Sequence, residues 1–95
     1  MGHMASLHQD EIDARRVLDA VVLPADVLGY GLRLGEFGDN PALWITFRTS
    51  IPDDAPLPEL QTAAARLNGF ADQVQAAMMH VLPDRFPYVA FTAGP

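Results

Sequence analysis

The fold is decided by residues 28–35, Leu-Gly-Tyr-Gly-Leu-Arg-Leu-Gly, in which every second residue is large and apolar. Successive side chains of a β-strand point to opposite sides, so this alternation predicts a strand with one apolar side. A turn sequence at residues 38–41, Gly-Asp-Asn-Pro, leads into a second alternating stretch at residues 42–51. The two stretches are expected to form an antiparallel hairpin.

The turn at residues 38–41 sets the expected pairing of these strands. With four residues in the turn, the pairs are Gly35 with Trp44, Arg33 with Thr46, and Gly31 with Arg48. This register places the large apolar residues on one side of the sheet: Leu28, Tyr30, Leu32, Leu34, Leu43, Ile45 and Phe47. A slip by one residue would divide that set between both sides, so the hydrophobic pattern favours this register.

Helical periodicity is present on both sides of the hairpin. A first helix is expected over residues 7–22, with a capping-box pattern at Ser6 and Gln9 and a stop at Pro24. Its apolar stripe consists of Leu7, Ala14, Val17, Leu18 and Val21. A second helix is expected over residues 58–81, as one long helix, because its apolar stripe keeps its phase across Asn68-Gly69. A third strand is expected at residues 88–92.

This α-β-β-α-β order predicts one α+β domain, a two-layer sandwich. Its three-stranded sheet is expected to be mostly antiparallel, with the helices on one face. The third strand can lie beside the first strand, in the order 2-1-3, or beside the second strand in a mixed sheet, and the sequence does not choose. Residues 1–4, Met-Gly-His-Met, are typical of a cloning remnant, which leaves residues 5–95 as the domain.

The order of elements resembles the cytoplasmic domain of cation-diffusion-facilitator transporters and, more loosely, ferredoxin-like modules. The resemblance covers most of the chain as topology, and a shared fold alone does not imply a shared function. The metal-ligating histidines expected of that transporter family have no counterparts here. No residue is therefore assigned a role from the resemblance.

The second side of the predicted sheet combines glycine, arginine and aromatic residues and contains no carboxylate. Its members are Gly29, Gly31, Arg33, Gly35, Trp44, Thr46, Arg48 and Tyr88. Because Trp, Tyr and Arg most often anchor protein interfaces, this side is the expected partner-binding surface. Two alternatives compete with that interpretation. Trp44 lies over Gly35 with an arginine on its ring, or the first helix covers this side and makes Trp44 part of the core.

Composition narrows the classes of function. Six arginines, no lysine and twelve acidic residues give a net charge of −6, which disfavours general binding of DNA or RNA. The absence of cysteine excludes a thiol nucleophile and a cysteine zinc site. No apolar run approaches the roughly 20 residues that cross a bilayer, and no signal-peptide pattern is present, so a cytoplasmic location is expected. Arginine without lysine also indicates a bacterial genome rich in G and C.

No cluster in the sequence is typical of a catalytic, metal or cofactor site. Residues 29–35 differ from a dinucleotide fingerprint in the spacing of the third glycine. Asp53-Asp54 and His80 lack further ligands at a suitable spacing, and Ser50 with His80 lacks an orienting acid. We therefore expect no enzyme activity, cofactor or metal.

The expected function is that of a small protein-interaction module. It would be a regulatory, antitoxin-like or immunity-like subunit, or a homodimer that forms through the sheet face. The alternative is binding of single-stranded nucleic acid on the same face. Trp44 and Tyr88 would then stack on bases, while Arg33 and Arg48 would contact phosphates.

Overall fold

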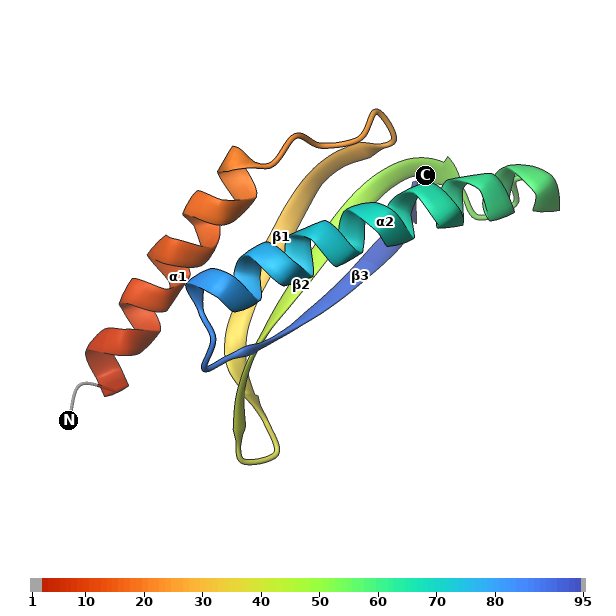
Figure 1. The fold of residues 1–95 in the computed structure, drawn as a ribbon. Helices are drawn as coiled ribbons and strands as arrows, with labels where there is room; N and C mark the ends of the chain where they lie inside the picture. Colours follow the sequence, from red (N-terminus) through yellow and green to blue (C-terminus); the bar gives the residue numbers. More distant parts are fainter. Residues whose placement is uncertain (1–2, 95) are drawn as a thin grey trace.

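The computed structural model describes residues 3–94, with two helices and three strands in that range (Figure 1). The elements are α1 (His3–Ala20), β1 (Val27–Phe37), β2 (Asn40–Pro52), α2 (Leu57–Val81) and β3 (Phe86–Gly94). The predicted α-β-β-α-β order and the α+β class are confirmed. Met1 and Gly2, the first half of the expected cloning remnant, lie outside the described residues.

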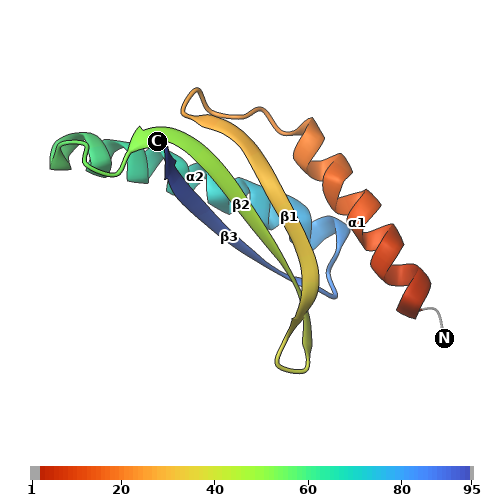
Figure 2. The ribbon, with the colours of Figure 1, turned by 180° about the vertical axis from the view of Figure 1, so that it is seen from behind.

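The sheet has the order β1-β2-β3 and is mixed. β1 and β2 are antiparallel, whereas β2 and β3 are parallel and are connected through α2. The expected antiparallel character therefore holds for one of the two pairs. Viewed from behind, the three strands lie in front of α2, and α1 lies beside β1 (Figure 2). No helix of the described chain lies over the side of the sheet that faces the viewer in Figure 2.

The hairpin turn has two residues, Gly38 and Asp39, instead of the four expected. Gly38 has a φ of +63°, which suits a glycine at the first position of a tight hairpin turn. The expected register is consequently wrong by two residues. The observed pairs are Phe37 with Asn40, Gly35 with Ala42, Arg33 with Trp44, and Gly31 with Thr46. Because side chains alternate with a period of two, this shift leaves each residue on its predicted side.

Leu28 is the exception among the residues expected on the apolar side. An irregularity between Val27 and Gly29 interrupts the pairing of β1 with β2 and leaves Leu28 exposed. An extra residue in a strand reverses the alternation of everything before it, so Val27 is buried in its place. The prediction that Leu28 belongs to the core is therefore wrong.

The core lies between α2 and the apolar side of the sheet. The buried residues of α2 recur at helical spacing: Ala63, Leu67, Phe70, Val74 and Met78. They belong to one cluster with the buried strand residues Leu43, Ile45 and Phe47. Val81, at the end of the helix, is exposed.

Helix α1 packs against the C-terminal part of α2 and the neighbouring β1, on the same side of the sheet as α2. Ala14 and Leu18 are buried there, whereas Leu7 is exposed. The helix begins at His3, so Ser6 lies inside it and the predicted capping box is wrong. Neither described helix is both long and apolar enough to cross a membrane.

A hydrogen bond connects α1 to the sheet at the C-terminal end of the helix. The hydroxyl of Tyr30 donates to the carboxylate of Asp19 at 2.9 Å. Burial, together with this bond, raises the pKa of the Tyr30 phenol above its ordinary value. The raised pKa extends the neutral, hydrogen-donating form of Tyr30 to a more alkaline pH.

Gly69 does not interrupt α2, which is continuous from Leu57 to Val81. A Cβ atom at Gly69 would meet nothing within 4 Å. We expect Gly69→Ala to raise the free energy of unfolding by about 0.5–1 kcal/mol, because alanine restricts the unfolded chain and favours the helix. The shift of the urea midpoint at constant slope measures the gain.

Gly38→Ala is the matched control for Gly69→Ala. The surroundings of Gly38 are equally open, but its positive φ disfavours any side chain. This variant should lose stability. A gain at both positions, or a loss at both, would contradict the conformational explanation.

Candidate functional site: the open side of the sheet

The open side of the sheet is the side that neither helix covers. Pairing arranges its side chains in four rows across the three strands. The rows are Gly29–Arg48–Thr92, Gly31–Thr46–Ala90, Arg33–Trp44–Tyr88, and Gly35–Ala42–Phe86. All eight residues predicted for the partner-binding surface lie in these rows, and none of the rows contains a carboxylate.

Two of the glycines on the open side lie directly under larger side chains. A Cβ atom at Gly35 would lie 3.3 Å from the indole of Trp44, and one at Gly29 would lie 2.7 Å from the guanidinium of Arg48. The guanidinium carbon of Arg33 lies 4.0 Å from the centroid of the Trp44 ring. Two alternatives were considered for Trp44, and the structure shows the first. The indole covers Gly35, and the guanidinium of Arg33 lies on its ring.

An aromatic cluster extends from Trp44 across the end of the sheet nearest the hairpin turn. The ring of Tyr88 stacks on that of Trp44 with centroids 5.9 Å apart, and it also contacts Phe37 at 5.7 Å and Phe86 at 4.8 Å. The exposed fractions of Phe37, Phe86 and Tyr88 are 62%, 47% and 36%. Exposed aromatic patches are uncommon on monomeric proteins and often mark binding surfaces.

Phe37 and Phe86 were not among the residues expected on this surface. Both continue the alternation that identified the other members, since Phe37 follows Gly35 by two residues and Phe86 precedes Tyr88 by two. They were missed because the first strand was ended at residue 35 and the third strand was begun at residue 88, whereas β1 extends to Phe37 and β3 begins at Phe86. A two-residue turn would have indicated Phe37.

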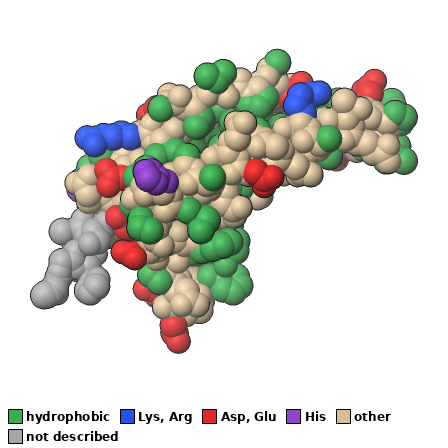
Figure 3. Space-filling view, in the orientation of Figure 1, with side chains coloured by type: hydrophobic (Ala, Val, Ile, Leu, Met, Phe, Trp, Pro, Cys, Tyr) green, Lys and Arg blue, Asp and Glu red, His purple; other side chains and the backbone are tan. Residues whose placement is uncertain are grey.

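The arginines of the open side differ from the other arginines in their electrostatic surroundings. Arg15, Arg16, Arg66 and Arg85 each form an ion pair with an acidic residue. Within residues 3–94, Arg33 and Arg48 form none. Acidic side chains are visible on the helical side of the molecule in Figure 3. The open side is therefore a locally positive surface on an acidic protein.

The remaining candidates for chemistry are not brought together. Asp53 and Asp54 precede α2, whereas His80 lies in its last turn, which is about 35 Å farther along the helix. Ser50, at the end of β2 that leads to α2, is separated from His80 in the same way. Within the described part of the chain, no three His, Asp or Glu side chains are grouped closely enough to hold a metal ion.

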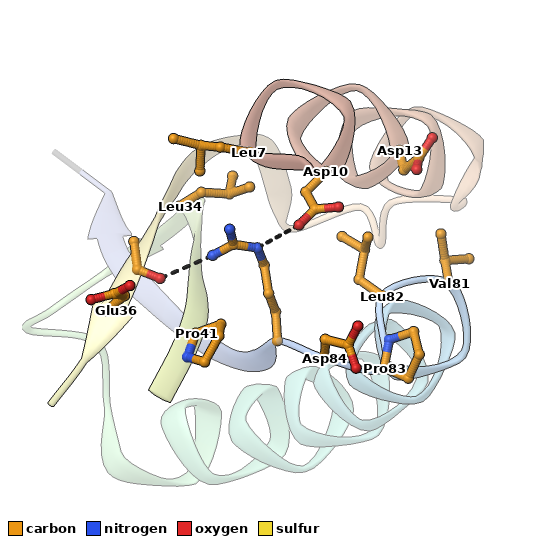
Figure 4. Close-up of a pocket in the computed structure, with 12 residues that line it drawn as sticks. Leu7, Asp10, Asp13, Leu34, Glu36, Pro41, Val81, Leu82, Pro83 and Asp84 are labelled. Atoms are coloured by element: carbon orange, nitrogen blue, oxygen red, sulfur yellow. Dashed lines mark hydrogen bonds and ion pairs between the residues drawn. The ribbon is translucent and has the colours of Figure 1, made fainter. Parts of the chain in front are cut away.

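A cleft of about 1010 Å³ lies between α1, the hairpin and the loop that precedes β3 (Figure 4). Arg85 extends into it, donating to the carboxylate of Asp10 at 2.8 Å and to the carbonyl oxygens of Gly35 and Ala42 at 2.9 and 3.1 Å. These bonds connect α1 to both strands of the hairpin. Nε and Nη1 of the guanidinium are bonded within the protein itself, which indicates a structural role.

Comparison with known proteins identifies the fold but no family. No protein-family model matches the chain, and no curated protein does. Three solved structures of MamM CTD variants match over nearly the whole length. The first is 13% identical with a TM-score of 0.56, and it covers 94% of this chain and 96% of its own.

The two other variants are 16% and 18% identical, and both have a TM-score of 0.50. They cover 98% and 96% of this chain, and each aligns over 98% of its own length. At such low identity, the likeness concerns the path of the backbone only. The chain is therefore similar in fold to MamM CTD.

Proposed function

We propose that the chain is a protein-interaction module that binds a polypeptide through the open side of its sheet. The proposal rests on one observation, the aromatic cluster of Phe37, Trp44, Phe86 and Tyr88 on a side that no described helix covers. Covering exposed rings removes apolar surface from water, and aromatic anchors dominate the energy of most interfaces. In this proposal the chain acts by binding rather than by catalysis.

Single-stranded nucleic acid fits this surface less well. Base stacking requires a free ring face, but the guanidinium of Arg33 already covers one face of the Trp44 indole. Only two arginines are available to follow a phosphate backbone, and the net charge of −6 repels a polyanion. A polypeptide can use the edges of the cluster and the exposed rings of Phe37 and Phe86 instead.

Two measurements on the purified chain test the proposal. Sedimentation equilibrium over a range of concentrations shows whether a second copy is bound. Selection of short random peptides by display on the immobilised chain shows whether a different polypeptide is bound. Because Trp44 is the only tryptophan, its emission also reports when the cluster becomes covered.

Phe37→Ser and Tyr88→Ser should each weaken the association by about tenfold or more, since truncation of an anchoring aromatic residue commonly costs 1–2 kcal/mol or more. Leu57→Ser is the matched control, because Leu57 is about as exposed as Phe37 but lies at the start of α2. It should leave binding unchanged. The proposal is overturned if the chain is monomeric and its selected peptides bind Phe37→Ser and Tyr88→Ser as tightly as the wild type.

A further inference from the structure

The unpaired arginines of the open side specify the chemistry of the partner. We propose that the partner is an acidic polypeptide segment that brings carboxylates to Arg33 and Arg48 and an apolar side chain to the aromatic cluster. This inference rests on the proposed function and narrows it. Within residues 3–94, Arg33 and Arg48 lack a carboxylate, whereas the four other arginines each have one.

Both guanidinium groups are already held against the sheet. That of Arg33 lies over the Trp44 ring, and that of Arg48 lies over Gly29, where the missing side chain makes room for it. An arginine positioned in this way loses less conformational freedom when it binds than one that extends freely into water. Its planar group of N–H donors matches the two oxygens of a carboxylate.

The sheet also fixes the spacing of the two groups. The guanidinium of Arg48 lies over Gly29, and Nη1 of Arg33 lies 4.0 Å from the position of a Cβ atom at Gly35. Gly29 and Gly35 are six residues apart on β1, which corresponds to about 20 Å at the rise of a strand. An extended segment that runs along β1 would span this distance with acidic residues about six positions apart. Phe86 lies in the same row as Gly35, so an apolar residue about two positions from the acid that meets Arg33 would reach the cluster.

A second copy presented by the same side fits less well. Two open sides face to face would bring four arginines together without a carboxylate among them, and desolvated like charges oppose association. A separate acidic segment supplies the missing charge. Since the chain itself carries a net charge of −6, such a segment gains no long-range attraction, and its binding depends on the two arginines at contact.

The experiment uses peptide display on the wild-type chain, followed by titration of one selected synthetic peptide. Peptides retained by the wild type should be enriched in Asp and Glu together with an apolar residue. Arg33→Gln and Arg48→Gln should each lower the affinity for that peptide by about tenfold. When the acidic residues of the peptide are replaced by Gln, the loss of affinity should be much smaller for the double variant Arg33→Gln/Arg48→Gln than for the wild type. Such a difference indicates direct pairing between the peptide carboxylates and the arginines.

Arg16→Gln is the matched control, because Arg16 lies on α1 away from the open side and its side chain is 77% exposed. It should bind the peptide as the wild type does. Urea unfolding of each variant verifies that the sheet is intact, since Arg33 also packs on Trp44.

The outcomes separate the inference from the proposed function. If the selected peptides have no excess of Asp and Glu and fail to bind Tyr88→Ser, the inference is overturned and the proposed function stands. A dimer that dissociates in Tyr88→Ser but persists in Arg33→Gln/Arg48→Gln would replace the acidic segment by a second copy. If the selected peptides bind equally well to the wild type, to Tyr88→Ser and to the double arginine variant, the inference and the proposed function are both overturned.

Discussion

Replacing Phe47 by alanine should lower the free energy of unfolding by about 3–5 kcal/mol, the largest loss expected for a single truncation in this core. The Phe47 side chain is fully buried at the centre of the sheet. Its ring packs edge-on against Phe70 of α2 with centroids 4.9 Å apart, and it stacks on Phe91 of β3 at 5.7 Å. Removing it would leave a cavity bordered by both layers.

Thermal unfolding measures this loss directly. For a chain of this length, 3–5 kcal/mol corresponds to a fall of more than about 12 °C in Tm. Phe47→Leu is the control, because it retains most of the apolar volume and should cost far less than alanine. A loss below about 1 kcal/mol for Phe47→Ala would mean that this region is not the packed centre of the domain.

Replacing Arg85 by methionine should cost about 2–3 kcal/mol, because it leaves three acceptors without their donor. The Arg85 and Asp10 side chains are only 11% and 22% exposed, so water replaces the lost bonds poorly. Two of the acceptors are the carbonyl oxygens of Gly35 and Ala42, in neighbouring strands. Methionine retains the length of the side chain and removes only its polar group.

A double-mutant cycle with Asp10→Asn isolates the contribution of the ion pair from that of the carbonyl bonds. We expect a coupling free energy of about 1 kcal/mol or more between the two residues. Arg16→Met, at an exposed ion pair, should change stability by less than about 0.5 kcal/mol. Equal effects at Arg16 and Arg85 would show that the cleft is solvated and that Arg85 does not connect α1 to the hairpin.

Apart from Leu28, which lies at the irregularity in β1, hydrophobic alternation was sufficient to predict which residues share a side of the sheet. A register error of an even number of residues leaves every residue on its side of the sheet, whereas an odd error moves it to the other side. An error of two therefore changed the partner of Trp44, from Gly35 to Arg33, without moving any member of the open side. Strand order has no comparable local signal, because both positions for β3 satisfy the same pattern.

The contacts that the sequence did not indicate join residues far apart in the chain. Asp10 and Arg85 are 75 positions apart, and neither lies in a motif that would suggest their pairing. Thr49 is buried although it is polar, and its hydroxyl donates to the carbonyl oxygen of Thr92 on the neighbouring strand. Such partners become apparent only when β3 is placed beside β2.

The parallel pairing of β2 with β3 has a consequence for the order of assembly. The β1–β2 ribbon closes through two residues, an event that takes microseconds in isolated hairpins. β3 has no place to bind until the 25-residue α2 has crossed the sheet and returned the chain to the starting end of β2. We therefore expect β3 to pair with β2 late in folding, since this pairing requires loop closure over a long segment.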